Sequence, residues 1–307
     1  MTALAPYPVG PDTEWAFQRY EQVRHRMPAP DFPATSVSAH DLGEVAGHFD
    51  AFILDAFGVL NIGATAIAGA CEAMANLRRL GKQLCVLTNG ATQTRQQSLD
   101  KYNSLGFDFS PHELVSSRDV AANSLASIQA DIIWAAAAGP GDDFSDIPAT
   151  VIDLIDQPDA FARAGGFLFL SSARWTSRLQ QQWLDSLRQN PRPVVVANPD
   201  LVAPRETHLS LEPGCYANAM ADELGLSVRF FGKPYSEAFE VVMSRWPDIQ
   251  PERIAMVGDT LHTDVLGAHA AGIKSILVSD HGLFAAHDLQ TFISSSGITP
   301  DFIVATP

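Results

Sequence analysis

The stretch FILDAFGVLNIG, residues 52–63, decides the fold, because an apolar segment in it leads directly into an aspartate and a glycine turn. A fully apolar run is typical of a strand buried on both faces of a parallel sheet. Ligands of such sheets bind where the strands end. Asp55 is therefore predicted to lie at a ligand-binding edge, and Phe57 brings an aromatic side chain into the same turn.

Short apolar runs alternate with helical patterns on both sides of this segment. Further strands are predicted at 83–89, 114–117, 253–259, 275–280 and 301–305. Helices are predicted at 70–81, 94–106, 119–128 and 264–273. This alternation predicts an α/β fold with a parallel sheet that is covered on both faces.

The middle of the chain, residues 129–229, has elements of its own. Strands are predicted at 131–139, 150–155, 165–172 and 192–200, and helices at 176–189 and 213–225. The second helix is expected to begin at Pro213 and end at Gly225. We therefore expect a sheet domain formed by 45–128 and 230–307, with an inserted second α/β domain at 129–229.

The first 44 residues are predicted to form a helical extension. A helix is expected over 14–27, and the segment SVSAHDLGEVAGHF is expected to form a second, capped helix that begins near Ser36 or Ser38.

Bulk composition limits the partners. The 307 residues carry a net charge of −15 with a pI near 4.8, which disfavours nucleic acid and anionic membranes as partners. The apolar runs are too short or too interrupted to span a bilayer, and no secretory signal pattern opens the sequence. The three cysteines lack metal-type spacing, so we expect reduced thiols in a cytoplasmic protein.

Polar residues stand where several predicted strands end. Asp55, the pair Thr88 and Asn89, and Asp259 each follow an apolar run, and Lys233 follows a shorter one. Taken singly, each residue has an ordinary explanation as a turn residue or a helix cap. Their joint order along the chain is far more specific.

Together they resemble the four motifs of the haloacid dehalogenase (HAD) superfamily. The matching segments are LDAFGVL (54–60), VLTNG (86–90), GKP (232–234) and VGDTLHTD (257–264). Residues 63–95, 197–206 and 213–225 are similar to the class IIA subgroup, which is NagD-like and carries a C2a-type cap. The resemblance covers residues 45–307 and implies a HAD-like Rossmannoid core with an inserted cap domain.

The resemblance implies a magnesium-dependent phosphatase for a small phosphorylated metabolite. Asp55 would be the nucleophile that forms an aspartyl-phosphate. Thr88, Asn89 and Lys233 would bind the phosphoryl group. Mg²⁺ would be held by Asp55, the backbone carbonyl of Phe57 and Asp259, with Asp264 in support. Such a cation and lysine allow an acidic protein to bind an anion.

Phe57 departs from the family pattern. Most HAD phosphatases carry a second aspartate there, which protonates the leaving alcohol and then activates water. General acid–base catalysis, worth about 10²–10⁴ in rate, is then missing or supplied elsewhere. His262 is the nearest substitute in sequence, although an ordinary structural histidine is the preferred interpretation.

Other classes remain open beside a phosphatase. One is a HAD scaffold that binds a phosphorylated ligand or a partner without turnover. Another is a carbon–halogen hydrolase, which DAFG resembles but GDTLHTD and the cap type oppose. A cap-lysine Schiff base, as in the phosphonate-cleaving relatives, is excluded because no lysine lies between Lys101 and Lys233.

The predicted cap is expected to contact and recognise the leaving group of the substrate. Asn198, Asp200 and Arg205, in ANPDLVAPRE, are the candidate cap contacts, with SSARW at 171–175 as a weaker one. The resemblance also suggests a homodimer.

Overall fold

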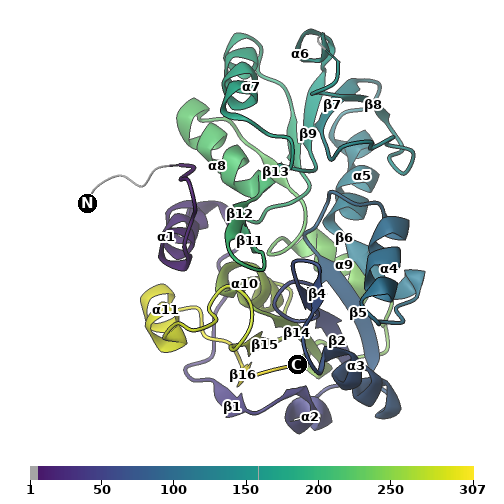
Figure 1. The fold of residues 1–307 in the computed structure, drawn as a ribbon, viewed down its shortest axis with the longest axis vertical. Coiled ribbons are helices and arrows are strands. Elements are labelled where there is room, and N and C mark those ends of the chain that lie inside the picture. The colour runs from purple at the N-terminus through teal and green to yellow at the C-terminus, as the bar shows by residue number, and fades with distance from the viewer. Residues whose placement is uncertain (1–5, 158) are drawn as a thin grey trace.

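A computed structural model describes residues 6–157 and 159–307. The first five residues of the predicted extension lie outside the described residues. Figure 1 shows two layered α/β units, a larger one below and a smaller one above, with helix α1 beside their junction.

The larger unit is built on a seven-stranded sheet in which every neighbouring pair is parallel. The strand order is β1-β16-β15-β14-β2-β5-β6. The strands are β1 (Val37–Ala39), β2 (Ala51–Leu54), β5 (Gln83–Thr88), β6 (Leu114–Ser116), β14 (Ile254–Gly258), β15 (Lys274–Val278) and β16 (Phe302–Val304). Except for β1, they confirm the strands predicted there.

Helices cover both faces of this sheet. They are α2 (Leu42–Val45), α3 (Ala70–Arg79), α4 (Arg95–Ser104), α5 (Ser117–Ile128), α9 (Ser236–Met243), α10 (Leu266–Ala270) and α11 (Leu289–Ser296). The short helical turns are Ala46–His48, Pro111–Glu113, Pro251–Arg253 and Leu261–Val265. Successive residues of β2 pack into different apolar clusters, Phe52 and Leu54 into one and Ile53 into another. This explains why β2 is apolar throughout.

The smaller unit has a five-stranded sheet, also parallel, in the order β13-β10-β9-β7-β8. Its strands are β7 (Ile133–Ala137), β8 (Thr150–Asp153), β9 (Gly166–Phe169), β10 (Val194–Val196) and β13 (Arg229–Phe230). Its helices are α6 (Ala160–Arg163), α7 (Ser177–Gln189) and α8 (Pro213–Leu224). As predicted, α8 begins at Pro213 and is stopped by Gly225, which caps its C-terminus with a φ of +65°.

Two antiparallel hairpins extend from these units toward each other. β3 (Asn61–Ile62) pairs with β4 (Thr65–Ala66), and β11 (Val202–Pro204) pairs with β12 (Leu209–Leu211). The fold class is therefore α/β with a parallel central sheet and additional sheets, as predicted. The domain boundaries stay a prediction, and we call residues 129–229 the cap segment and residues 45–128 with 230–307 the core segment.

The N-terminal extension is only partly as predicted. Helix α1 (Thr13–Val23) and the turn Arg24–Arg26 confirm the helix expected over 14–27. The predicted start of the second helix near Ser36 or Ser38 is wrong, because Val37–Ala39 forms the edge strand β1, paired with β16. The following helix, α2, begins later, and Asp41 caps it by accepting a hydrogen bond from the Glu44 amide.

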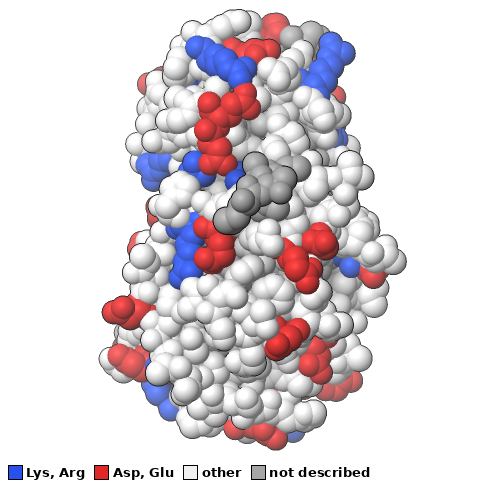
Figure 2. Space-filling model, turned by 90° about the vertical axis from the view of Figure 1, so that its left-hand side faces the viewer, with Lys and Arg blue, Asp and Glu red and all other residues white. Residues whose placement is uncertain are grey.

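Helix α1 and the turn that follows it contact both segments. Arg19 and Arg26 form ion pairs of 2.6 and 2.7 Å with Asp222 of α8, in the cap segment. On the core side, Thr13 donates a hydrogen bond to the Leu283 carbonyl, and Arg24 donates one to the Ser296 carbonyl. Figure 2 shows this side of the molecule, where acidic and basic side chains lie in small groups, several of them next to a group of the opposite charge. No helix among the described residues is long and apolar enough to cross a membrane.

Candidate active site

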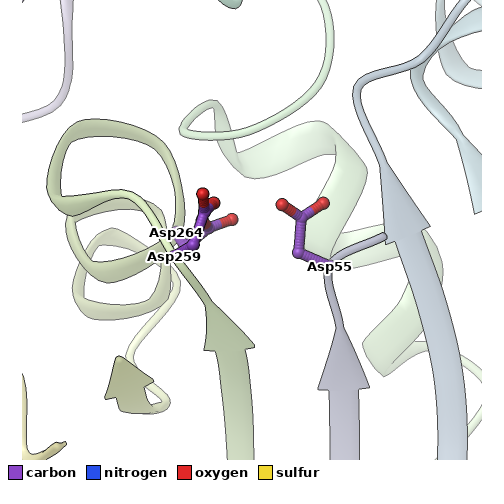
Figure 3. A group of neighbouring side chains, drawn as sticks. All are labelled: Asp55, Asp259 and Asp264. Atoms are coloured by element: carbon purple, nitrogen blue, oxygen red, sulfur yellow. The ribbon is translucent and has the colours of Figure 1, made fainter. Parts of the chain in front are cut away.

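Three aspartates meet where β2 and β14 end. Asp55 directly follows β2, Asp259 directly follows β14, and Asp264 lies one turn further on. All three are buried, and one oxygen from each carboxylate lies within 4.8 Å of the others. Figure 3 shows their carboxylates facing a common space. The site thus lies at the carboxyl ends of neighbouring parallel strands, as expected for an open α/β sheet.

Two glycines allow the chain to approach Asp259 closely. Gly58 and Gly282 have φ values of +75° and +78°, and a Cβ at either position would overlap the Asp259 side chain. The carboxylate accepts hydrogen bonds from the Leu283 amide at 2.7 Å and from the Thr260 hydroxyl at 3.0 Å. Gly58 therefore serves this position both by its positive φ and by its lack of a side chain.

Lys233 lies between two of the aspartates. Its Nζ is 2.5 Å from Asp55 Oδ1 and 2.8 Å from Asp264 Oδ1, and the side chain is buried. Burial alone would lower the pKa of Lys233, but Asp264 and Asp55 outweigh it and raise the pKa. At neutral pH the ammonium is therefore charged, and its two ion pairs hold it beside Asp55.

Asn89 holds this lysine in place. Its side-chain oxygen accepts a hydrogen bond from the Lys233 amide at 2.7 Å, and its Nδ2 donates to the Lys233 carbonyl at 2.9 Å and to Asp200 at 2.8 Å. The side chain predicted to bind phosphate is thus engaged within the protein. Thr88 ends β5, and its hydroxyl accepts a hydrogen bond from the Gly90 amide at 3.0 Å.

The three buried aspartates carry more negative charge than Lys233 can balance. Burial raises the pKa of Asp55 to about 6 even though Lys233 opposes the shift, and with the charge of Asp55 it raises the pKa of Asp259 well above its usual range. One ammonium cannot balance three carboxylates, and buried unbalanced charge is costly. The oxygen-rich cluster therefore fits a divalent cation such as Mg²⁺.

A cavity of about 500 Å³ opens above the aspartates, between the core and cap segments. Asp55, Thr88, Asn89 and Asp259 line it from the core. The three predicted cap contacts also line it, namely Asn198, Asp200 and Arg205. The structure therefore brings these sequence-predicted residues around one space. Burial raises the pKa of Asp200 to about 8.

Phe57 forms part of the cavity wall and is flanked by two cations. Lys101 Nζ lies 4.8 Å from the ring centroid, and Arg205 Cζ lies 5.4 Å from it. Lys101 belongs to α4 of the core segment, and Arg205 follows β11 of the cap segment. Sequence reasoning did not single out Lys101, since its helix was predicted but its orientation was not.

His262 points away from the cavity. Its Nε2 lies 2.6 Å from Glu21 of α1, and its ring stacks on Tyr20 with centroids 4.9 Å apart. Burial lowers the pKa of His262, although Glu21 opposes the shift. The residue is a neutral buried contact between α1 and the core, in agreement with the preferred interpretation. Tyr20 lines the cavity instead, and no pattern in the sequence pointed to it.

Comparison with known proteins places this geometry in a family. The haloacid dehalogenase-like hydrolase family matches residues 52–142, and a HAD-hydrolase-like family matches residues 230–306. Glycerol-3-phosphate phosphatase from Gallus gallus is 28% identical, and the alignment covers 85% of this chain and 90% of that protein.

Solved structures share most of this architecture. A possible sugar phosphatase from Cytophaga hutchinsonii has a TM-score of 0.79 at 24% identity and covers 89% of this chain and 98% of its own. Glycerol phosphate phosphatase from Mycobacterium tuberculosis, in complex with magnesium, has a TM-score of 0.67 at 22% identity. The match covers 84% of this chain and 75% of that one. NagD from E. coli has a TM-score of 0.65 at 21% identity, and the match covers 84% of this chain and 96% of that one.

The first match runs from the core segment into the cap segment as far as residue 142, and the second begins directly after the cap segment. Together the two matches include the three aspartates and Lys233. The chain belongs to the haloacid dehalogenase-like hydrolases, and it has the fold of their NagD-like, class IIA members. It is a hydrolase of this family with Phe57 in its first motif.

Proposed function

We propose that this protein is a magnesium-dependent phosphatase that hydrolyses a small phosphomonoester. The observation that carries the proposal is the meeting of Asp55, Asp259, Asp264 and Lys233 beside a cavity of about 500 Å³, which Asp55 and Asp259 line. Cavities of this size suit small metabolites. Relatives bearing phosphatase names support the choice of reaction.

Asp55 is the proposed nucleophile. One of its oxygens attacks phosphorus, the bond to the leaving alcohol breaks, and an aspartyl-phosphate forms. Water then attacks that phosphorus and releases phosphate and the free carboxylate. Lys233 orients Asp55 and offsets charge on the phosphoryl oxygens, and the Thr88 hydroxyl donates to one of them. Asn89 contributes by positioning Lys233.

Asp55, Asp259 and the Phe57 carbonyl are the proposed metal ligands, and Asp264 supports them. The buried oxygen-rich cluster, whose negative charge exceeds that of Lys233, supports this assignment. When bound, Mg²⁺ supplies charge stabilisation for the phosphoryl oxygens. The carboxylates of Asp259 and Asp264 are already oriented by the Leu283 and Thr260 amides.

Phe57 favours a second candidate function, the binding of a phosphorylated ligand without turnover. A phenyl ring cannot protonate a leaving alcohol or activate water. A halide leaving group would need no proton, but the cluster of three carboxylates is not what a metal-free dehalogenation requires. The phosphatase and the binding protein therefore remain the two functions to separate.

Phosphate release from a panel of phosphomonoesters separates them. With Mg²⁺, we expect turnover by the wild type, a loss of at least about 10³-fold in Asp55→Asn because the nucleophile is gone, and a similar loss with EDTA. Asp248→Asn, an exposed carboxyl on the core, is the matched control and should retain full activity. Equal phosphate release by wild type and Asp55→Asn would remove Asp55 from the reaction. Ligand binding without any release would support the second candidate.

A further inference from the structure

Lys101 differs from the other three lysines of the chain. Lys82 donates to the Phe49 carbonyl, Lys233 pairs with Asp55 and Asp264, and Lys274 pairs with Asp301. Lys101 has no carboxylate within 4.0 Å among the described residues, and its ammonium instead lies over the rings of Phe57 and Tyr102. It is half-buried on the wall of the cavity that contains Asp55.

Arg205 is the second cation at this wall, but its charge is already balanced. It donates to Glu212 and to the Ser210 hydroxyl, both at 2.9 Å. The Lys101 ammonium is half-buried on the same ring as Arg205, and burial and the charge of Arg205 lower the pKa of the ammonium although Asp55 opposes the shift. An ammonium in such a place gains most from an anion brought by a ligand.

We infer that Lys101 and Arg205 form a subsite for a carboxylate carried by the leaving group of the substrate. The inference rests on the proposed phosphatase function and names its substrate class, a phosphomonoester of a small hydroxy acid. The phosphoryl group lies at Asp55, the carbon chain lies along the Phe57 ring, and the carboxylate meets Lys101 with Arg205 beside it.

The charge at the subsite favours a carboxylate over a second phosphate. Glu212 neutralises Arg205, so Lys101 contributes a single unbalanced positive charge. One carboxylate matches it, whereas a phosphate dianion would leave negative charge in a cavity that already contains Asp55, Asp200 and Asp259. The subsite also joins the two segments, because Lys101 comes from α4 and Arg205 from the β11–β12 hairpin.

A matched pair of substrates tests the subsite. 3-Phosphoglycerate and glycerol 3-phosphate differ only in a carboxylate against a hydroxymethyl group. In the wild type, we expect kcat/KM to favour 3-phosphoglycerate by at least about tenfold, as one charge-assisted contact allows. Lys101→Met keeps the apolar stem, and Lys101→Met and Arg205→Gln should each reduce that ratio at least about fivefold. Lys82→Met and Arg178→Gln, which change a core lysine and an exposed cap arginine, should leave the ratio unchanged.

The outcomes separate the subsite from the reaction. If both substrates are hydrolysed through Asp55 but the ratio is near one, or does not respond to Lys101→Met, the subsite is wrong and the phosphatase stands. A preference for 2,3-bisphosphoglycerate over 3-phosphoglycerate would also overturn the carboxylate assignment. If the wild type releases no phosphate, the phosphatase proposal is wrong. Calorimetric titration of the two ligands with Mg²⁺ then tests the subsite by itself. A tenfold affinity preference lost in Lys101→Met supports the subsite, and equal affinities refute it.

Discussion

At the scale of single residues, Phe57 has the largest consequence for chemistry. Its ring lines the cavity between Lys101 and Arg205, at the position where the family's proton-transferring aspartate stands. The cluster of Asp55, Asp259 and Asp264 does not include the side chain of Phe57. The proposed enzyme therefore keeps nucleophilic attack but lacks this route for protonating the leaving oxygen.

The leaving group should therefore control the rate. p-Nitrophenolate leaves without a proton, whereas an alkoxide does not, so the wild type should hydrolyse p-nitrophenyl phosphate much faster than alkyl phosphates. Phe57→Asp should reduce this kcat ratio by about 10²-fold, because general acid catalysis helps only the poor leaving group. The measurement is steady-state phosphate release from both substrates.

Phe57→Asn is the control for this prediction, because it removes the same ring without supplying a proton donor of suitable pKa. The ratio should stay at the wild-type value in that variant. An equal reduction in both variants would mean that the ring acts by shape alone and that proton transfer is not the missing function.

At the scale of elements, helix α1 connects the two segments. Tyr20 is buried, stacks on His262 of the core, and accepts a hydrogen bond from the Leu201 amide of the cap segment at 3.1 Å. Arg19 adds an ion pair to Asp222, but that pair is partly exposed and contributes little. The buried hydrogen bond of Tyr20 is therefore the contact whose loss should be measurable.

Tyr20→Phe should lower the free energy of unfolding by about 1–3 kcal/mol, because it leaves the buried Leu201 N–H without its acceptor. Urea unfolding followed by circular dichroism measures the change. Tyr216→Phe removes a hydroxyl that forms no hydrogen bond among the described residues, and it should cost less than about 0.5 kcal/mol. Equal losses in the two variants would show that the bond across the junction is not what stabilises the fold.

The strands that carry Asp55, Thr88 and Asp259 were predictable from sequence, because a buried parallel strand leaves a local signal, a continuous apolar run. The edge strand β1 was not. Val37–Ala39 has no such run, and it becomes a strand only by pairing with β16, more than 260 residues away. Local capping patterns near Ser36 and Ser38 therefore led to the wrong element.

The candidate site was predictable to the same extent. The positions of the three aspartates and Lys233 follow from strand ends and motif order, and the structure places them together. Lys101 and Tyr20 also line the cavity, but their positions there depend on which way a helix faces after packing. No spacing in the sequence encodes that, because a residue halfway along a polar helix such as α4 is usually solvated.

At the scale of the whole molecule, an acidic protein of net charge −15 buries further acids in its cavity. Burial raises the pKa of Asp55 to about 6 and that of Asp200 to about 8, against about 3.9 in an unfolded chain. At these two groups the folded protein therefore binds more protons than the unfolded chain between these values. By linkage, the contribution of Asp55 and Asp200 to the free energy of unfolding falls as pH rises from about 4 through each folded pKa.

At high pH, where the carboxylates are ionised, bound Mg²⁺ should restore the lost free energy of unfolding, because the cation replaces the protons that the cluster releases. We expect saturating Mg²⁺ to raise the Tm by on the order of 5 °C at pH 8, and by less than about 1 °C at pH 5, where protons compete for Asp55. Thermal unfolding followed by circular dichroism, with EDTA as the metal-free reference, measures both shifts. Asp259→Asn should abolish the shift at pH 8, because the cluster loses a ligand while the fold keeps an oxygen for the Leu283 amide. An equal Mg²⁺ effect at both pH values, or one that persists in Asp259→Asn, would place the cation away from the three aspartates and so separate metal binding from the proposed reaction.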